Sequence, residues 1–231
     1  MKTKITNLAI VGAVDFQLLF LTEKDRVIGG TSSVIRNIIN YLEAEHIYLF
    51  GVTYDKKLLE TEIKINEKTT FIPIVYLSKK SKIPSRITIF FKSKNINKLL
   101  KKYKIESVYS HSIEISYRIN YKRNPVVQHM HGANNAISKA SFKNLRISAF
   151  IKLWNLIRKK TLTKANKIIA IDDDCTQLAK KYSNSENIIE IPNFVDTSVF
   201  YLDKTESKYT TPYKDKKIAL FVGRIEEVKG L

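Results

Sequence analysis

Cysteine is nearly absent from this sequence. Its scarcity limits the disulfides and metal sites that the protein can form, and it bears on the cellular compartment. Cys175 is the one cysteine among 231 residues, which excludes an intramolecular disulfide and a zinc site built from several cysteines. No catalytic-cysteine motif surrounds it, and we expect its thiol to have a structural role. Because such a chain is typical of a reducing compartment, we expect a cytoplasmic protein.

Long hydrophobic runs are absent too. No segment of the sequence reaches the ~20 consecutive apolar residues of a transmembrane helix. The apolar run near the N-terminus stops at Asp15 without the small-residue cleavage site of a secretory signal, and it predicts a first strand instead. We therefore expect no membrane span, and peripheral attachment to the inner face of the cell membrane stays open.

Acidic residues are missing from two long parts of the chain. Residues 79–104 hold ten Lys or Arg and no acid, no acid lies between Glu114 and Asp172, and the net charge is +18. Such blocks favour an anionic partner, whether nucleotide, lipid or nucleic acid. A coding bias toward A and T would also produce this lysine-rich composition. Nucleic acid is the unlikely partner, because no helix-turn-helix, zinc or aromatic-sheet signature is present.

Apolar runs rich in β-branched and aromatic residues alternate with stretches of helical spacing. Strands are predicted at 5–11, 47–52, 71–77, 107–109, 125–128, 167–171 and 188–191. Helices are predicted at 31–43, 86–103, 142–163 and 173–182. Continuous apolar strands that alternate with helices predict an α/β fold with a doubly wound, Rossmann-like parallel sheet.

The predicted domains follow from a change of pattern near residue 200. We expect an N-terminal Rossmann-like domain over residues 1–200 and a polar linker over 201–217. We expect residues 218–231 to form the first strand and loop of a second domain, truncated after Leu231.

Candidate site residues follow predicted strands, because parallel sheets bind ligands at the carboxyl ends of their strands. Gly29, Gly30 and Thr31 precede a helix whose free amides could bind a phosphate, although a simple capped turn is the alternative. His129 and His131 are separated by one residue, so they point to the same side if the strand extends that far.

His111 follows the strand at 107–109 and could line the same cleft, with a structural role as the alternative. We expect no metal site, because the sequence shows no further converging ligands around the histidines.

Asp172, Asp173 and Asp174 begin a helix, where capping is favoured over magnesium binding. The basic helix at 142–163 could lie on anionic lipid or cover the sheet with a solvated basic face.

Five stretches of the sequence, taken in order, resemble the family 4 retaining glycosyltransferases of GT-B fold. The most specific are Pro-Asn-Phe-Val-Asp-Thr-Ser-Val-Phe within 191–200 and Val-Gly-Arg with Lys-Gly within 221–231. The other three are 29–31, Gln-His-Met-His-Gly at 128–132, and 165–171. Asn193 is followed by Phe194 where the family commonly has glycine.

The resemblance implies roles for single residues. His131 would match the active-site histidine that contacts the donor sugar. Gly30, with Gly29 and Thr31, would match the glycine loop that approaches the donor diphosphate. Arg224 and Lys229 would match the basic pair that neutralises the leaving diphosphate. The candidates for lining the cleft are His111, His129, Gly132 and Asn193. No protein nucleophile and no metal are implied.

The implied function is transfer of a sugar from a nucleotide-diphosphate sugar to a glycan or lipid-linked acceptor in surface polysaccharide synthesis. The nucleotide sugar is the donor substrate, and no cofactor is expected. Because the donor domain would lie beyond Leu231, we expect the chain to be inactive alone. The alternative is a noncatalytic acceptor-binding subunit that needs a separate donor-domain chain.

Overall fold

The computed structural model describes residues 5–20, 30–133, 147–194, 197 and 216–217. The chain divides into two units, Met1–Phe194 and Val195–Leu231. The first unit holds all the strands and helices given below. The expected linker at 201–217 lies almost wholly outside the described residues, as does the whole of 218–231, so the predicted domain boundaries stay a prediction.

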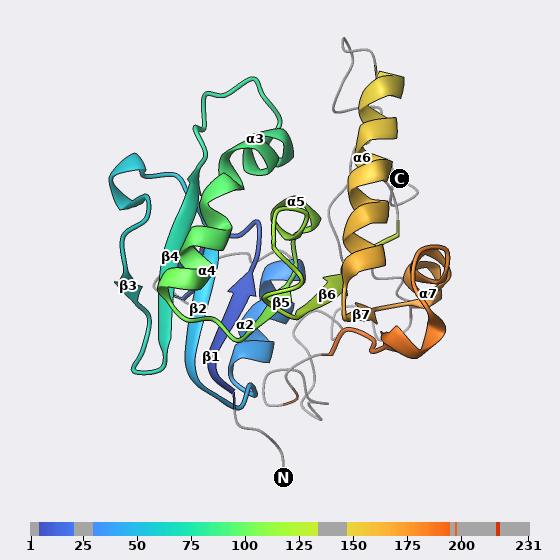
Figure 1. The fold of residues 1–231 in the computed structure, drawn as a ribbon, viewed down its shortest axis with the longest axis horizontal. Coiled ribbons are helices and arrows are strands. Elements are labelled where there is room, and N and C mark those ends of the chain that lie inside the picture. The colour runs from blue at the N-terminus through green and yellow to red at the C-terminus, as the bar shows by residue number, and fades with distance from the viewer. Residues whose placement is uncertain (1–4, 21–29, 134–146, 195–196, 198–215, 218–231) are drawn as a thin grey trace. The chain divides into compact units, whose positions relative to one another are not determined.

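Eight strands form one sheet in the order β3-β4-β2-β1-β5-β6-β7-β8 (Figure 1). Each neighbouring pair is parallel except β3 with β4. The predicted doubly wound parallel sheet is therefore confirmed, and the short antiparallel edge strand β3 is an addition to it. The strands are β1 (Ile5–Val11), β2 (Ala44–Thr53), β3 (Ile63–Lys64), β4 (Thr69–Tyr76), β5 (Ser107–Ser110), β6 (Val126–Met130), β7 (Lys167–Ala170) and β8 (Ile188–Glu190).

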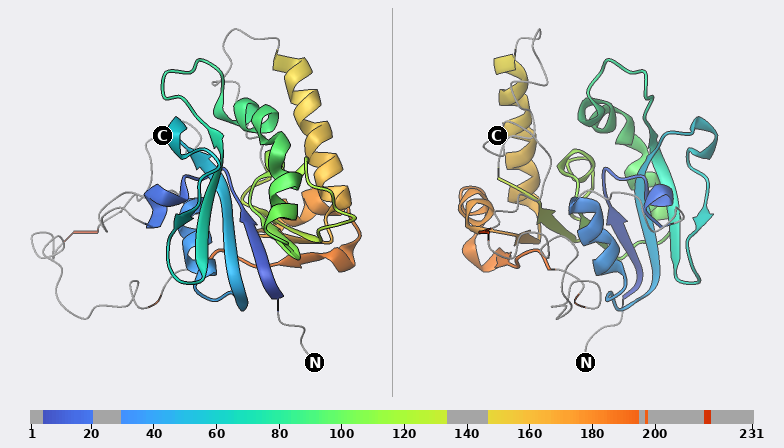
Figure 2. Two further views of the ribbon diagram at one scale, coloured as in Figure 1. Left: turned by 60° about the vertical axis from the view of Figure 1, so that its left-hand side comes forward. Right: turned by 180° about the vertical axis from the view of Figure 1, so that it is seen from behind.

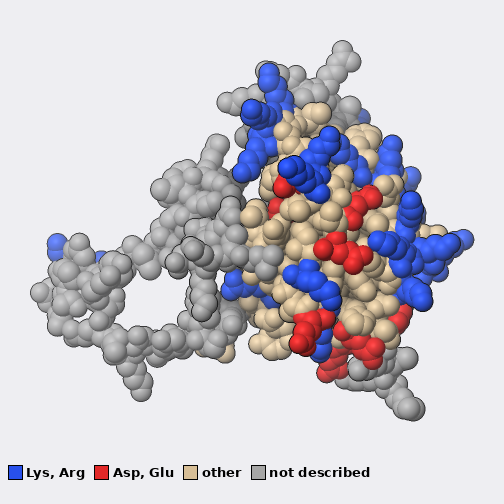
Figure 3. Space-filling model, turned by 90° about the vertical axis from the view of Figure 1, so that its left-hand side faces the viewer, with Lys and Arg blue, Asp and Glu red and all other residues tan. Residues whose placement is uncertain are grey.

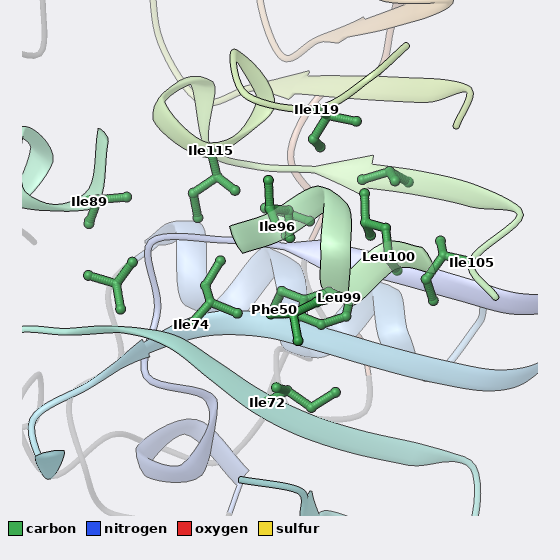
Figure 4. Close-up of a cluster of buried hydrophobic side chains, with 14 of the residues drawn as sticks. Phe50, Ile72, Ile74, Ile89, Ile96, Leu99, Leu100, Ile105, Ile115 and Ile119 are labelled. Atoms are coloured by element: carbon green, nitrogen blue, oxygen red, sulfur yellow. The ribbon is translucent and has the colours of Figure 1, made fainter. Parts of the chain in front are cut away.

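Alternate residues of β1 enter two separate cores. Ala9 and Val11 belong to a cluster with residues of three helices, which are α3 (Ser85–Lys92), α4 (Ile96–Lys102) and α5 (Ile113–Ser116). Leu8 and Ile10 pack instead with α1 (Phe16–Phe20) and α2 (Gly30–Ile39). Figure 4 shows the first cluster, in which Phe50 of β2 lies close to side chains of α4. Each fully buried aliphatic or aromatic side chain stabilises the fold by about 1.5–3 kcal/mol.

Among the described residues, seven α-helices lie along the chain, and they cover the two faces of this sheet (Figures 1 and 2). The predicted helix at 86–103 is wrong as one element: it is interrupted by a 3₁₀ turn at Ser93–Asn95. Ser93 Oγ donates to Phe90 O, and such side chains compete with the helical hydrogen bonds. The helices are α1 (Phe16–Phe20), α2 (Gly30–Ile39), α3 (Ser85–Lys92), α4 (Ile96–Lys102), α5 (Ile113–Ser116), α6 (Ile147–Lys164) and α7 (Asp173–Lys180).

Helix α7 begins as the sequence predicts. Asp172 is its N-cap, and its Oδ1 accepts a hydrogen bond from Cys175 N at 2.7 Å. Capping by Asp172 is thereby confirmed. Cys175 is fully buried beside Met130 and Leu162, and burial raises the pKa of its thiol to about 12. A buried, protonated thiol suits the expected packing role.

Charges of both signs share the face of the molecule over β3 and β4 (Figure 3). Lys102 of α4 forms an ion pair with Glu62 at 3.4 Å, and Tyr103 Oη donates to the same carboxylate at 2.8 Å. Despite the net charge of +18, this face is therefore not uniformly basic. No helix of the described part of the chain is both long and apolar enough to cross a membrane.

Gly51 allows the segment after β1 to cross closely over β2. Val52 N donates to Val14 O at 2.9 Å, and a Cβ added at Gly51 would overlap the Val14 carbonyl and lie 2.7 Å from the Phe16 ring. The pairing of β2 with β4 also shifts register between Gly51 and Val52. A side chain at position 51 would therefore displace Val14, which follows β1 at its carboxyl end.

We predict that Gly51→Ala lowers the free energy of unfolding by about 1–3 kcal/mol, the usual cost of overpacking. Urea denaturation measures this change. Gly30→Ala is the matched control, because a Cβ at Gly30 meets nothing within 4 Å and alanine is the better helix former. Equal unfolding midpoints for the two variants would contradict the proposed clash.

Candidate functional site

The carboxyl ends of β1, β5 and β6 surround a cavity of about 540 Å³. Strand order reverses here, since β2 and β4 lie on one side of β1 and β5 to β8 on the other. Val14 follows β1, His111 follows β5, and His131 follows β6; all three line the cavity. Open α/β sheets bind ligands at such a reversal of strand order, so this cavity is the candidate site.

Two of its histidines come from the end of β6. The rings of His129 and His131 stack with centroids 4.5 Å apart and an angle of 7° between their planes. Met130, between them, packs on the other side with Leu162 and Ile168. Strand β6 therefore continues two residues beyond its predicted end at Gln128, and the predicted common direction of the two histidines is confirmed.

His111 joins them from β5. Its Nδ1 lies 2.8 Å from His131 Nε2, and its ring centroid is 5.0 Å from those of both His129 and His131. The register that pairs Ser110 with Gln128 brings these residues together, because His111 and His129 each come one position later. His111 therefore lines the same cleft, and its role, structural or catalytic, stays a prediction.

Burial keeps the three imidazoles neutral at physiological pH. Desolvation lowers the pKa of His129 to about 3 and the pKa of His131 to about 4. Desolvation, together with the neighbouring rings, lowers the pKa of His111 well below its ordinary value. A neutral imidazole has one donor and one acceptor nitrogen, so each ring can bind a polar ligand group through either role.

Several buried polar atoms of the cavity have no hydrogen-bond partner among the described residues. They are His111 Nε2, His129 Nε2, Gln128 Oε1 and Arg158 Nε. Buried polar atoms are normally paired in folded proteins, because an unpaired one costs about 1–3 kcal/mol. Their gathering around one cavity indicates that the site is built to bind a polar group.

A buried carboxylate supports the wall beside His111. Glu114 of α5 accepts hydrogen bonds from Arg86 Nη1 at 2.9 Å and from Ser112 Oγ at 2.7 Å. Ser112 is also the N-cap of α5. The Arg86 guanidinium lies over the Trp154 ring, 5.8 Å from its centroid, so the ion pair links α3 and α5 to α6.

The glycine-rich candidate lies partly at this cavity. Thr31 and Ser32, at the start of α2, line it, and Gly30 is the exposed first residue of that helix. The free amides and the positive dipole end of a ten-residue helix therefore lie at the cavity wall. Gly29 lies outside the described residues.

The remaining predicted site residues divide into three groups. Gly132 lines the cavity with a φ of +156°. Asn193 is exposed beyond the edge strand β8 and is not among the residues around this cavity. Arg224 and Lys229 lie outside the described residues.

Sequence reasoning missed several residues of the cavity wall, among them Arg86, Glu114, Trp154 and Arg158. Arg158 Nη1 donates to Ala133 O at 3.0 Å, so it belongs to the site rather than to the solvated face of α6. The rarity of arginine is a signal in the sequence that could have pointed to Arg86 and Arg158. Only eight of the 40 basic residues are arginine, and two of these eight line the cavity. A planar guanidinium makes directed hydrogen bonds that lysine does not.

Comparison with protein families agrees with this geometry. The family described as Glycosyltransferase Family 4 matches residues 28–199, which include the three histidines of the cavity and the start of α2. The chain belongs to glycosyltransferase family 4.

The fold of this family 4 chain is shared with a solved structure. Sucrose-phosphate synthase from Thermosynechococcus elongatus superposes with a TM-score of 0.56 at 12% identity, over 85% of this chain and 50% of that one. A glycosyltransferase from Rickettsia africae has a TM-score of 0.45 at 20% identity, over 85% and 45% of the two chains. The family 4 chain thus spans about half the length of these structures. No curated protein matches it.

We predict that Arg86→Ala destabilises this family 4 chain by about 1–3 kcal/mol, because the buried Glu114 carboxylate loses its charged partner. Urea denaturation measures the loss. The double variant R86A/E114Q removes the unpaired charge and should recover most of that stability. Equal stability of the single and double variants would show that the unpaired Glu114 carboxylate is not the cause of the lost stability.

Proposed function

We propose that the chain takes part in transferring a sugar from a nucleotide-diphosphate sugar, with His131 facing the donor sugar. The observation that carries this proposal is the position of His131, hydrogen-bonded to His111 in a cavity at the strand-order reversal of a family 4 sheet. Family membership provides the reaction class, and the cavity provides the place for it.

His131 contributes a directed hydrogen bond to the sugar. The contact with His111 engages its Nε2 and leaves its Nδ1 for a hydroxyl of the donor. A neutral ring held in one orientation binds that hydroxyl without reorganising during the reaction, and such preorganised groups stabilise a transition state. His111 is then a positioning residue, since it acts through His131.

The start of α2 suits the leaving diphosphate. Breaking the anomeric bond places negative charge on the diphosphate, and the free amides of a helix N-terminus bind such charge. Thr31 and Ser32 at the cavity wall bring these amides to the site. This stabilisation requires no metal ion at the diphosphate, and Arg224 and Lys229 are proposed to add to it.

We propose that the reaction retains the anomeric configuration without a protein nucleophile. Among the described residues, Glu114 is the carboxylate that lines the cavity. Arg86 and Ser112 each engage one of its oxygens, and its side chain is 3% exposed. A carboxylate held in this way is poorly placed to attack a sugar, which supports departure and attack on the same face.

We predict that His131→Ala lowers the rate of nucleoside-diphosphate release from the donor by ~10²–10³, the usual cost of losing one preorganised group. The assay follows a panel of nucleotide sugars with host lipid extract as the acceptor source, in the presence of a chelator. Both chains are compared under the condition in which the unaltered chain turns over, either alone or with a donor-domain chain added. His46→Ala is the matched control, since His46 is exposed on β2.

Unchanged turnover in the His131 variant would overturn the assigned role. Turnover that begins only when a separate donor-domain chain is added would favour the acceptor-binding subunit as the form in which this chain works.

We propose further that the acceptor is lipid-linked, in surface polysaccharide synthesis at the inner face of the cell membrane. One stripe of α6 supports this: its exposed residues recur at helical spacing and combine two leucines with three lysines. Leu153 and Leu156 are 44% and 46% exposed. The stripe consists of Lys152, Leu153, Leu156, Lys159 and Lys160.

We predict that the double variant K159E/K160E weakens flotation with anionic vesicles by at least ~30-fold, since each lysine near an anionic surface contributes about 1 kcal/mol. K180E/K181E carries the same charge change on exposed residues at the end of α7 and is the control. Arg158 is left unchanged because it bonds Ala133 O in the cavity. Equal flotation of both variants would remove the membrane proposal.

A further inference from the structure

We propose that His111, His129 and His131 form a binding site for one divalent transition-metal ion of the zinc type. Each histidine offers one ring nitrogen, and these three nitrogens lie within 4.8 Å of one another. The sequence alone predicts no metal site, because it shows no third ligand near His129 and His131. The pairing of β5 with β6 supplies that ligand from 18 residues earlier in the chain.

The spacing of the rings suits three ligands around one ion. Their centroids form a triangle with sides of 4.5, 5.0 and 5.0 Å. With zinc–nitrogen bonds of about 2.0–2.1 Å, a tetrahedral site separates its ligand nitrogens by roughly 3.3 Å and its ring centroids by roughly 5 Å. The backbone therefore already holds the imidazoles at the separation that a three-histidine site needs.

Metal binding requires the rings to turn. Their planes lie within 31° of parallel, whereas the lone pairs of three metal ligands must converge. Turning the rings of His111 and His131 about χ2 breaks the hydrogen bond between them, and one nitrogen of each ring then binds the ion. The fourth position of the ion is left for water or a ligand from the cavity, as in zinc sites with three protein ligands.

Two features point to a ligand at these nitrogens rather than to simple packing. His129 is 5% exposed, and its Nε2, like His111 Nε2, has no hydrogen-bond partner among the described residues. The other nitrogen of His129 already has a second-layer contact, since Nδ1 lies 2.7 Å from Tyr109 Oη. When Nε2 binds the ion, Nδ1–H donates to that hydroxyl oxygen, which orients the ring as second-layer groups do in metal sites.

Three imidazoles select the class of ion. Imidazole nitrogen favours zinc, cobalt, nickel and copper, whereas magnesium and calcium prefer oxygen ligands. Glu114, the carboxylate at the cavity wall, is engaged by Arg86 and Ser112, so the cavity offers no free carboxylate among its described residues. The site is therefore expected to discriminate strongly against magnesium.

The ion and the donor sugar would compete for His131. This consequence rests on the proposed function, in which the same imidazole contacts the sugar. A bound ion would then inhibit sugar transfer, and a saturating nucleotide sugar would weaken binding of the ion.

The test is a titration of the untagged chain with Co²⁺ after treatment with a chelator, followed by its visible absorption, with Zn²⁺ binding measured by calorimetry. We expect one ion per chain and no response to Mg²⁺. His111→Ala, His129→Gln and His131→Ala should each weaken binding by more than the ~10–100-fold typical of losing an outer-layer partner. His46→Ala should bind as the unaltered chain does. Circular dichroism shows whether each variant is folded.

Tyr109→Phe separates metal binding from packing, because it keeps all three ligands and removes the hydroxyl beside His129 Nδ1. We expect it to weaken Co²⁺ binding by about 10-fold. The proposal fails if Co²⁺ leaves the spectrum unchanged, or if His46→Ala weakens binding as much as the cluster variants. These titrations contain no nucleotide sugar, and the turnover assay contains a chelator. A failure of either proposal is therefore visible without the other.

Discussion

Parallel pairing of β5 with its two neighbours brings together the three histidines on which the candidate site depends. His111 N donates to Val11 O at 2.7 Å, which continues the pairing of β1 and β5 one residue beyond the strand end. On its other side, β5 is paired with β6 so that Ser110 faces Gln128. These contacts hold His111 between the segment after β1 and the histidines of β6, at the reversal of strand order where an open sheet binds ligands.

A layer of polar contacts around the histidines makes this arrangement specific. Tyr109 holds one nitrogen of His129, and Gln128 Nε2 donates to Ser110 O at 3.1 Å across the two strands. The ion pair of Arg86 and Glu114 supports the wall of the same cavity. Such buried polar groups are costly when unpaired, so their pairing limits the site to one geometry. His111 Nε2 and His129 Nε2 differ from these groups, because neither has a hydrogen-bond partner in the part of the chain that the structure describes.

The lysines and arginines that give the high net charge have different roles in the structure. Lysines supply most of it, and many lie on exposed faces, such as Lys102 beside Glu62 and the lysines of the α6 stripe. Arginines are rare, and the structure uses Arg86 and Arg158 in directed contacts at the cavity. The net charge of the sequence therefore describes mainly the lysine-rich surface. The positions of the few arginines indicate the site better, because arginine makes directed hydrogen bonds.

Local patterns in the sequence were enough to predict the fold class, most strands and helices, the cap at Asp172 and the common direction of His129 and His131. Each of these depends on residues a few positions apart, through side-chain alternation, helical spacing or a capping hydrogen bond. The edge strand β3 was missed because its two residues carry no recognisable period. The break between α3 and α4 was missed because a buried serine there acts through side-chain contacts. Only the tertiary structure decided that His111 meets His131, that Arg86 pairs with Glu114 and that Gly51 must lack a side chain. Those contacts join segments 20 to 37 residues apart, and strand register and helix packing, which no local pattern encodes, determine them.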